Sequence, residues 1–416
     1  MDKNHQINFD YTASYPLDPT VLESMLPYFS ERYGNPSSLY APGSIARTAF
    51  SESQKKVGDL INAESPEREI FFTSGATESN NLAMKGFAFR NKRKGNHIII
   101  SSIEHISVIN IVKYLQRNDF KVSYVPVDKF GIINLSKLKE SITDETILTS
   151  IMYANNELGT IQPINEIGKI LHKNNIVFHV DGTVAAGKIP IDVVKDNINI
   201  LTLSSNDIYG PKGVGGLYVK LGTIIEPILQ GGGQQRGLRS GSENIPGIVG
   251  FGKAAELARK RMTTDSKRIS MLRDTLIKGI LNEIEDSYLH GHPKKSLPDI
   301  ALLRIFGIEG EAIVTELDEK GICISTGSAC AAKTLSPSHV LEAIGLNEIQ
   351  RHGALQFSLA RQNNKKDIDL LLTLLPNIVN RLREISPVWK YKDRFLEMYT
   401  SAEEEEHLED DEFKQF

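Results

Sequence analysis

The sequence predicts an α/β fold, with a mostly parallel sheet covered by helices. The main observation is a series of seven short runs rich in apolar and β-branched residues, with helix-length segments between most of them. This alternation is typical of parallel strands joined by crossover helices. The predicted strands are residues 69–73, 97–101, 122–127, 147–152, 176–181, 198–205 and 216–220.

A change of pattern after about residue 262, from alternation to long helices with fewer strands, indicates a second and smaller α+β domain. A chain of 416 residues is long enough for two domains. We expect a large domain over residues 16–262 and a small domain formed by residues 1–15 and 263–396. Residues 397–416 are acidic and poor in apolar side chains, which predicts a disordered tail.

Elements outside the alternating region follow from local signals. Residues 8–16 predict a short strand and a turn, and the Gly-Asn-Pro-Ser-Ser stretch at 34–38 predicts a loop. Residues 367–385 predict the last long helix, which Pro376 should kink. A helix with one buried face is predicted where apolar side chains recur at helical spacing. These side chains are Ala46, Phe50, Val57, Leu60 and Ile61.

Composition and charge exclude several classes of protein. The net charge of −4 argues against a nucleic-acid-binding surface, which needs clustered lysine and arginine. The polar first ten residues do not resemble a signal peptide, and no apolar run approaches the length of a membrane span. The only cysteines are Cys323 and Cys330, too few for a disulfide framework. We therefore expect a cytoplasmic protein with no nucleic-acid or membrane partner.

The stretch LTLSSNDIYGPKGVGG, residues 201–216, predicts two strands joined by a polar corner. Asn206 and Asp207 interrupt the first strand, and the Gly-Pro-Lys-Gly sequence at 210–213 forms a turn. Residues 204–207 therefore lie at the end of a strand, where α/β sheets bind their ligands.

Residues 73–81, TSGATESNN, follow a predicted strand and begin a helix. Small residues at this position let backbone N–H groups and a hydroxyl approach a phosphate at the positive helix end. The alternative is a plain N-cap formed by Thr73 or Ser74. Other strands are followed by further polar side chains, and these are His105, Asn156 and Asp181.

Together these motifs resemble the cysteine desulfurases, the NifS/IscS-like branch of the class-V aminotransferases, over about residues 8–390. The matching segments include TSGATESNN, the corner at 204–213, RSGSEN at 239–244 and STGSAC at 325–330. The resemblance implies fold type I of the pyridoxal phosphate (PLP)-dependent transferases, with a mostly parallel seven-stranded sheet and a smaller α+β domain. It also implies PLP as the cofactor.

The resemblance assigns roles to the residues at the strand ends. It implies that Ala76 and Thr77 bind the phosphate of PLP and that His105 stacks on its ring. It also implies that Asp181 pairs with the pyridinium nitrogen, an interaction that stabilises the electron-poor ring. A structural histidine and a capping or solvated aspartate are the alternatives for these two residues. The other implied cofactor contacts are Asn156, Ser204 and Asn206.

Two further loops carry implied roles. In relatives the hydroxyl at the position of Ser242 reaches the phosphate bound by the other subunit, so the match implies a homodimer with shared active sites. The cysteine at the position of Cys330 takes up sulfur as a persulfide, which requires a thiolate in an exposed loop. An inert buried thiol is the alternative for Cys330, and it is the preferred interpretation of Cys323, which lies in an apolar run.

Four positions depart from the family pattern. Asp207 stands where the family has the lysine that forms a Schiff base with PLP, and Asn206 replaces the neighbouring histidine. Val184 replaces a glutamine that binds the phenolic oxygen of the cofactor, and Gln356 replaces the arginine that binds the substrate carboxylate. A carboxylate cannot form an imine. Some archaeal members of the family resemble this chain at the corner, so we interpret the change as a subfamily feature.

Three functions are consistent with this pattern. The first is a desulfurase-like protein of sulfur transfer and iron–sulfur cluster assembly that binds PLP non-covalently and has weak or no desulfurase activity. Its partner would be an IscU-like scaffold protein, towards which Cys330 would carry sulfur or ligate the iron of a shared iron–sulfur cluster. The second is an active enzyme that releases sulfur from L-cysteine to Cys330, with Lys188 or Lys212 as its amine. The third is a scaffold-binding protein without cofactor.

Overall fold

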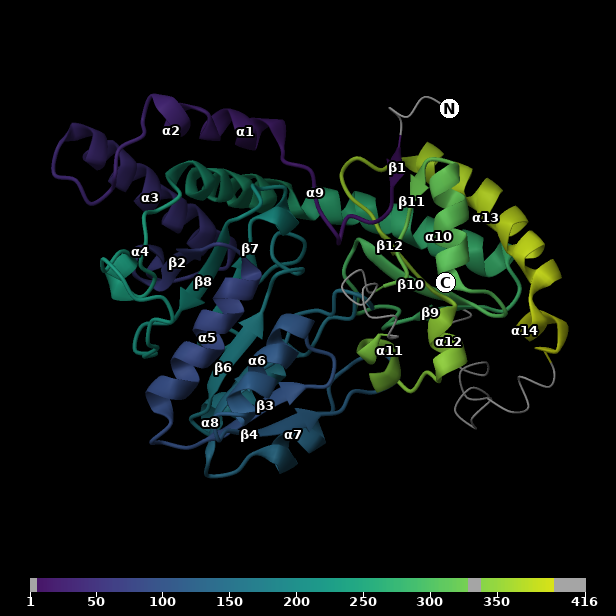
Figure 1. Cartoon of the computed structure of the whole chain (residues 1–416), viewed down its shortest axis with the longest axis horizontal. Helices are drawn as coiled ribbons and strands as arrows, with labels where there is room; N and C mark the ends of the chain where they lie inside the picture. Colours follow the sequence, from purple (N-terminus) through teal and green to yellow (C-terminus); the bar gives the residue numbers. More distant parts are fainter. Residues whose placement is uncertain (1–5, 328–337, 393–416) are drawn as a thin grey trace.

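The computed structural model describes residues 6–327 and 338–392 (Figure 1). A large sheet covered by helices lies beside a smaller sheet with helices of its own. The predicted α/β class, with a smaller α+β part, is confirmed. The tail at 397–416 that the sequence predicts to be disordered, and the predicted persulfide residue Cys330, lie outside the described residues.

The central sheet has seven strands in the order β2-β8-β7-β6-β5-β3-β4. The strands from β3 to β7 run parallel, whereas β8 pairs antiparallel with both β7 and β2. Each strand begins and ends within two residues of its predicted limits, so all seven predictions are confirmed. The strands are β2 (Ile70–Thr73), β3 (His97–Ser101), β4 (Lys121–Val125), β5 (Thr146–Ser150), β6 (Val177–Asp181), β7 (Ile200–Ser204) and β8 (Gly215–Val219).

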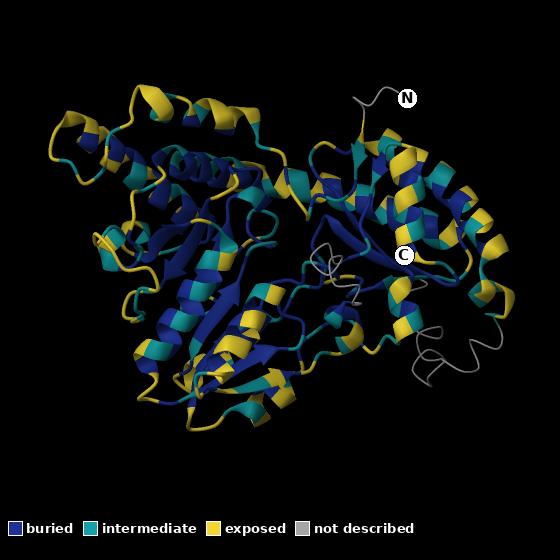
Figure 2. Ribbon diagram, in the orientation of Figure 1, coloured by how far each residue is buried: buried dark blue, intermediate teal, exposed yellow. Residues whose placement is uncertain are grey.

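Helices cover both faces of the central sheet, because alternate residues of a strand point to opposite sides. Ile98 and Ile100 of β3 pack into a core that includes α5 (Ala76–Asn91). Ile99 packs on the opposite face, in a core that includes α3 (Ala41–Leu60). Figure 2 shows the buried strands between helices whose outer surfaces are exposed. Strands buried on both faces have continuous apolar sequences, which explains why they could be predicted.

The smaller sheet is antiparallel, with the strand order β12-β10-β9, and β1 pairs with β11 beside it. The pairing of β1 brings the first described residues into the smaller core, where Phe9 is fully buried. Helices α10 and α13 pack into the same core. The elements are β1 (Ile7–Asn8), β9 (Ser287–His290), β10 (Ile300–Ile305), α10 (Gly310–Glu319), β11 (Ile322–Cys323), β12 (Ala354–Ser358) and α13 (Lys365–Ile385).

The helix α9 (Ile245–Glu283) contributes to both cores. Its first part places Phe251 in the core of the large sheet, and its later part places Ile277 and Ile280 in the core of the smaller sheet. The domain boundary predicted at residue 262 lies inside this helix, and the predicted domain limits stay predictions.

The two predicted helices outside the alternating region are confirmed as α3 and α13. Helix α13 begins two residues earlier than predicted because Asn364 and Asp367 form a capping box there. It includes Pro376, and the kink expected at this residue stays a prediction.

None of the helices in the described ranges is long and apolar enough to cross a membrane. The remaining α-helices are α1 (Pro19–Met25), α2 (Pro27–Ser30), α4 (Pro66–Glu69), α6 (Ile106–Gln116), α7 (Leu135–Ser141), α8 (Ile164–Lys173), α11 (His339–Ala343), α12 (Glu348–His352) and α14 (Pro387–Lys390).

Candidate functional site

The polar residues singled out in the sequence gather at one edge of the central sheet. Strands β3, β5, β6 and β7 are parallel and end at this edge. Strand β2 ends there too, since β2 and β7 both run antiparallel to β8. The side chains that follow these strands therefore face a common region, which is where open α/β sheets bind their ligands.

The first turn of α5 offers free backbone donors to this region. No side chain of the described residues caps the helix, so the plain N-cap by Thr73 or Ser74, expected as an alternative, is not formed. Among the described residues, the amides of Ala76 and Thr77 donate no hydrogen bond. A Cβ atom added at Gly75, whose φ is +154°, would meet no atom of residues 6–327 or 338–392 within 4 Å, so these residues leave the space beside Gly75 open. Free amides at an open helix end suit an anion such as a phosphate.

An ion pair holds the first turn of α5 to the loop at 239–244. The guanidinium of Arg239 donates to both carboxylate oxygens of Glu78, at 2.8 and 3.2 Å. The amide of Ser74 donates to the same carboxylate at 2.8 Å. Burial alone would raise the pKa of Glu78, but the hydrogen bonds from Arg239 and Ser74 lower it below its usual value. The exposed Ser242 lies on this loop, which the ion pair holds against the first turn of α5 in the same chain.

A hydrogen-bonded chain joins Asp181 to His105. The amide nitrogen of Asn80 donates to Asp181 Oδ2 at 2.8 Å and to Ser107 Oγ at 3.1 Å. Ser107 Oγ lies 2.8 Å from His105 Nδ1. Asn80 is fully buried, and its Oδ1 atom has no partner among the described residues. The carboxylate of Asp181 and the Asn80 oxygen, unpaired among the described residues, are two buried acceptors joined through this chain to an imidazole, and together they fit the ring of PLP with its protonated nitrogen.

The corner after β7 places a second carboxylate at this edge. Asp207 lies in a single helical turn, η1 (Asn206–Ile208), and is buried. Burial raises its pKa, and the negative charge of Asp181 acts in the same direction. A hydrogen bond from Ser204 and the positive charge of Lys188 oppose this rise. The position that relatives use for an amine therefore carries a carboxyl group close to another acidic side chain.

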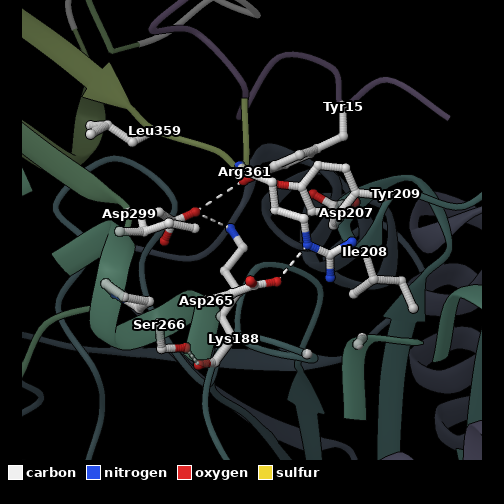
Figure 3. A pocket seen from close by; sticks show the side chains of 14 residues that line it. Tyr15, Lys188, Asp207, Ile208, Tyr209, Asp265, Ser266, Asp299, Leu359 and Arg361 are labelled. Atoms are coloured by element: carbon white, nitrogen blue, oxygen red, sulfur yellow. Dashed lines mark hydrogen bonds and ion pairs between the residues drawn. The ribbon is translucent and has the colours of Figure 1, made fainter. Parts of the chain in front are cut away.

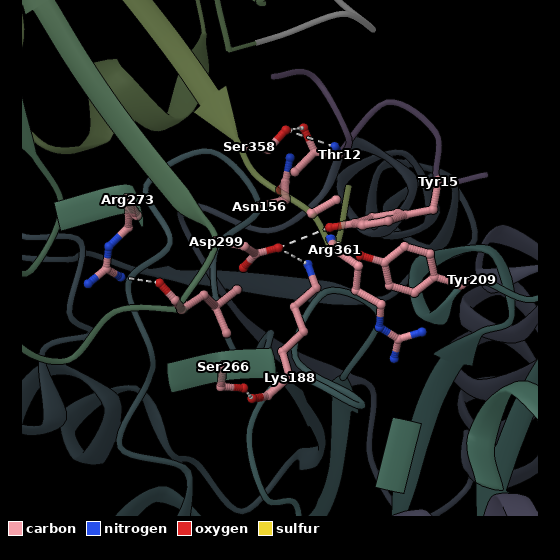
Figure 4. Close-up of polar contacts among 12 residues, drawn as sticks. Thr12, Tyr15, Asn156, Lys188, Tyr209, Ser266, Arg273, Asp299, Ser358 and Arg361 are labelled. Atoms are coloured by element: carbon pink, nitrogen blue, oxygen red, sulfur yellow. Dashed lines mark hydrogen bonds and ion pairs between the residues drawn. The ribbon is translucent and has the colours of Figure 1, made fainter. Parts of the chain in front are cut away.

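Lys188 reaches a small pocket between the two cores, which Asp207 also lines (Figure 3). Its Nζ atom lies 2.5 Å from Asp299 Oδ2, and the hydroxyl of Tyr15 donates to the same oxygen at 2.9 Å (Figure 4). Both members of the ion pair are nearly buried, with side-chain exposures of 11% and 3%. Lys212, the other amine considered from the sequence, donates to the carbonyl oxygen of Tyr15 at 2.8 Å.

The two remaining departures from the family pattern also have defined surroundings. The amide nitrogen of Gln356 donates to the carbonyl oxygen of Asn156 at 2.6 Å, and the side chain is 3% exposed. This donor is therefore used within the protein. Val184 packs against the core of the large sheet and supplies no polar group.

Cys323 is partly buried, and burial raises the pKa of its thiol, which lowers its thiolate fraction.

The family of this chain follows from its similarity to known proteins. It matches the family model described as Aminotransferase class-V over residues 7–371. The chain belongs to this family. A class-V relative from Archaeoglobus fulgidus, named cysteine desulfurase IscS 1, is 52% identical over 382 residues, which cover 92% of this chain and 99% of the relative.

Two more comparisons confirm the resemblance to cysteine desulfurases within the class-V aminotransferases. A protein of Clostridium botulinum named cysteine desulfurase IscS is 47% identical over 390 residues, or 93% of this chain and 98% of the relative. The solved structure of a NifS-like protein, 36% identical, matches with a TM-score of 0.85 over 91% of this chain and 100% of that one. The predicted PLP-dependent fold type I agrees with this class-V assignment.

The candidate site of this class-V family member contains most of the predicted contacts, whose roles stay predictions. Asn80 is part of the TSGATESNN motif, but the sequence does not indicate what it contacts. Ser107, which accepts its hydrogen bond, is not predicted as a site residue; the one signal for it is a polar residue among the apolar residues of α6. The described residues contain no cluster of three or more acidic, histidine or cysteine side chains that could hold a metal ion. The predicted iron ligand Cys330 lies outside them. The predicted contacts at the carboxyl edge are Ala76, Thr77, His105, Asn156, Asp181, Ser204 and Asn206.

Glu104, which precedes the candidate ring-stacking histidine, should make the stability of the protein depend on pH. It is fully buried, and it accepts hydrogen bonds from Ser101 at 2.5 Å and from the amide of Met152 at 2.9 Å. Burial raises its pKa from 4.5 to about 8. A carboxyl group with a raised pKa contributes stability that is fully present when the pH is below its ordinary pKa of 4.5. This stability is lost as the pH rises through the folded-state pKa of about 8.

We expect the wild-type protein to lose about 2–3 kcal/mol more than Glu104→Gln when pH rises from about 6 to about 9. Glutamine keeps an acceptor for Ser101 and Met152 but cannot ionise. Urea unfolding of both proteins at the two pH values measures this difference. An equal loss of stability in the two proteins would contradict the buried, protonated state of Glu104.

Proposed function

We propose that this chain binds PLP non-covalently and takes part in sulfur transfer and iron–sulfur cluster assembly, with weak or no desulfurase activity of its own. The observation that carries the proposal is the buried carboxylate of Asp207 at the position of the Schiff-base lysine. A carboxylate cannot replace an amine in covalent attachment. The two amines near the site, Lys188 and Lys212, are engaged with Asp299 and with the backbone of Tyr15.

The side chains and amides at the sheet edge support binding of PLP. PLP, when bound, supplies an electron-poor ring that can withdraw electrons from a substrate. The amides of Ala76 and Thr77 would hold its phosphate, and Asp181 would hold a proton on the ring nitrogen. Asn80 orients Asp181 through its 2.8 Å hydrogen bond, and it also fixes His105 through Ser107. These residues exclude water from the ring and set its position without a covalent bond.

We assign the sulfur chemistry to Cys330, because the STGSAC segment at 325–330 matches the family's cysteine loop. We propose that its thiolate attacks a sulfur atom of a polysulfide, so that an S–S bond of the donor breaks, the shortened polysulfide leaves and Cys330 carries a persulfide. It would then pass the outer sulfur to an IscU-like scaffold protein in the cytoplasm, or alternatively ligate the iron of a cluster shared with that protein. The names of the similar proteins support the sulfur part of this proposal, since the relatives from Archaeoglobus and Clostridium are both named cysteine desulfurases.

We propose that the protein acts as a homodimer. A group of large apolar side chains on α1, α2, α3 and the loop before α3 is exposed, including Leu39 at 96% and Tyr33 at 76%. Exposed apolar patches of this kind mark protein interfaces. The other members of this patch are Leu22, Leu26, Phe29, Tyr40 and Ile45.

Wild-type protein mixed with PLP and L-cysteine tests the proposal. We expect the absorbance of PLP to change on binding, sulfide to stay at background, and no peptide to carry PLP after borohydride reduction. When a polysulfide is supplied as the sulfur donor, Cys330 should gain the mass of one sulfur atom. The molar mass in solution should be twice 46.3 kDa. Sulfide release at the rate of the clostridial relative, or PLP fixed to any peptide, would overturn the non-covalent and inactive assignment.

The second candidate is an active desulfurase, in which the Cys330 thiolate forms an S–S bond with the sulfur of L-cysteine while the carbon–sulfur bond breaks. The Cβ atom keeps the electron pair of that bond, takes up a proton and leaves as alanine. One observation favours it, because Lys188 lines the same pocket as Asp207 and could supply the missing amine. The ion pair with Asp299 opposes it, since an amine held as ammonium is not a nucleophile. Borohydride reduction distinguishes the two candidates, because only the second predicts PLP on the peptide that contains Lys188.

A further inference from the structure

A row of polar side chains crosses three strands of the central sheet beside Asp181. Ser150 of β5, His179 of β6 and Thr202 of β7 are fully buried. His179 Nδ1 lies 2.8 Å from Ser150 Oγ, and His179 Nε2 lies 3.1 Å from Thr202 Oγ1. Both ring nitrogens are therefore paired inside the core, where an unpaired polar group would be costly.

The row lies on the face of the sheet that α5 covers. Each of its members follows, by two residues, an apolar residue of the core that includes α5, and residues two apart in a strand point to the same face. Asp181 follows His179 by two residues and is in register with Thr202 of the neighbouring strand. Neighbouring strands lie about 4.8 Å apart, so the side chains of Asp181 and Thr202 are neighbours. The three apolar residues are Leu148, Val177 and Ile200.

Asp181 accepts its hydrogen bonds from groups other than Thr202. Asn80 donates to its Oδ2 atom at 2.8 Å, and the amide of Thr183 donates to its Oδ1 atom at 3.0 Å. The Thr202 hydroxyl bonds to His179 instead. Each carboxylate oxygen can accept more than one hydrogen bond, so these contacts leave an acceptor for a further donor.

The imidazole of His179 is uncharged near neutral pH. Burial lowers its pKa to about 4, and the negative charge of Asp181 opposes this shift. A neutral imidazole has one donor and one acceptor nitrogen, and a hydroxyl can donate or accept, so both contacts can be satisfied together. A cation in this place would compete with a protonated ring nitrogen for the carboxylate of Asp181, and a neutral imidazole does not.

We propose that His179 is a positioning residue for Asp181, because it holds the Thr202 hydroxyl away from the carboxylate that would receive the ring nitrogen of PLP. Without the imidazole, the Thr202 hydroxyl would donate to Asp181 and occupy the acceptor that the ring nitrogen needs. The role towards PLP rests on the proposed function, whereas the arrangement of the row does not.

Two ligands that differ in one ring atom test this role, and they are PLP and its analogue with a CH group in place of the ring nitrogen. His179→Met removes both hydrogen bonds of the imidazole. We expect it to weaken PLP binding about tenfold, the effect of losing roughly one hydrogen bond, and to change binding of the analogue less than about twofold. Absorbance titration measures both affinities. Equal weakening of the two ligands would mean a general loss of the pocket and would overturn the proposal.

Two polar variants keep the test valid if methionine prevents folding. His179→Gln keeps a polar group that can reach Thr202, whereas the shorter side chain of His179→Asn can reach only Ser150. PLP should bind to His179→Gln within about threefold of the wild type and to His179→Asn about tenfold more weakly. Equal PLP affinities in these two variants would contradict the role of the Thr202 contact.

A second substitution should restore PLP binding, which a merely structural role of His179 does not predict. Thr202→Val removes the competing hydroxyl at almost the same shape, so His179→Met/Thr202→Val should bind PLP within about threefold of the wild type. Ser150→Ala is the matched control, because Ser150 is in register with His179 and not with Asp181. Added to His179→Met, it should restore nothing. Failure of Thr202→Val to restore binding, or equal restoration by Ser150→Ala, would overturn the proposal.

A crystal structure of PLP-free His179→Met tests the arrangement alone. Thr202 Oγ1 should turn to within hydrogen-bond distance of Asp181, and a hydroxyl that stays away from this carboxylate would refute the role of His179. Wild-type protein that binds neither PLP nor the analogue would contradict the proposed function instead, and the crystal structure would still decide the role of His179.

Discussion

Asp207→Lys is expected to convert non-covalent PLP binding into a covalent link. The substitution places a primary amine after β7, at the position where the family carries its own. Lys188 lines the same pocket, and its positive charge would lower the pKa of the added amine. More of the amine would then be neutral and nucleophilic at neutral pH. After borohydride reduction, peptide mapping should find PLP on the peptide that contains position 207, and on no peptide of the wild type.

Asp207→Asn is the matched control, because it removes the same charge without adding an amine. It should bind PLP but retain none after reduction. Sulfide release from cysteine should rise about 10²-fold in Asp207→Lys, the size of effect expected for one acid–base group. A larger gain is not expected, since Val184 supplies no donor and the amide of Gln356 is used within the protein. Failure of the lysine variant to hold PLP covalently would mean that the rest of the pocket is not preserved.

Lys188→Met is expected to cause the largest loss of stability among single substitutions at the site, about 3–5 kcal/mol. The change leaves the carboxylate of Asp299 buried without its counter-ion, and it also removes the positive charge that favours ionised Asp207. Asp299 Oδ1 has no hydrogen-bond partner among the described residues, so the Tyr15 hydroxyl on Oδ2 would be left as the side-chain donor that stabilises the charge. Equilibrium unfolding in urea measures the loss.

The double variant Lys188→Met/Asp299→Asn should recover most of that stability. Asparagine removes the buried charge but keeps an oxygen that accepts the hydroxyl of Tyr15. Removing both members of a buried ion pair is often close to neutral, whereas removing one is costly. If Lys188→Met alone cost less than about 1 kcal/mol, the ion pair would not be a significant element of the pocket.

Most of the large sheet could be predicted from sequence because its strands other than the edge strand β4 are buried, so their residues form apolar runs such as Ile98–Ile99–Ile100. The grouping of polar residues followed for a related reason, since parallel strands bring residues distant in sequence to one edge, whereas PLP as the ligand came from the resemblance to the family. The ion pair of Lys188 and Asp299 could not be predicted in this way. Its members are far apart in the sequence, with Asp299 immediately before β10, and no local pattern predicts that they meet.

The same limit applies to Gln356. The sequence shows that Gln356 replaces the arginine of the family pattern, but it does not show what the glutamine contacts. Its hydrogen bond to the carbonyl oxygen of Asn156 depends on the distance between β12 and the turn after β5, which no local signal encodes. Asn80 lies within the motif that indicates the site, so its position near the site could be predicted. Its hydrogen bond to Asp181 could not, because that contact depends on how α5 packs on the sheet.

The 39 residues of α9 have a mechanical consequence. A helix of this length is a rod of roughly 60 Å, and in this chain each half of the rod is embedded in a different core. A rotation of one core against the other would have to bend the rod or pull side chains out of close packing. The stiffness of α9 therefore limits how far the smaller sheet, which contains β12, can move relative to the carboxyl ends of the strands of the central sheet.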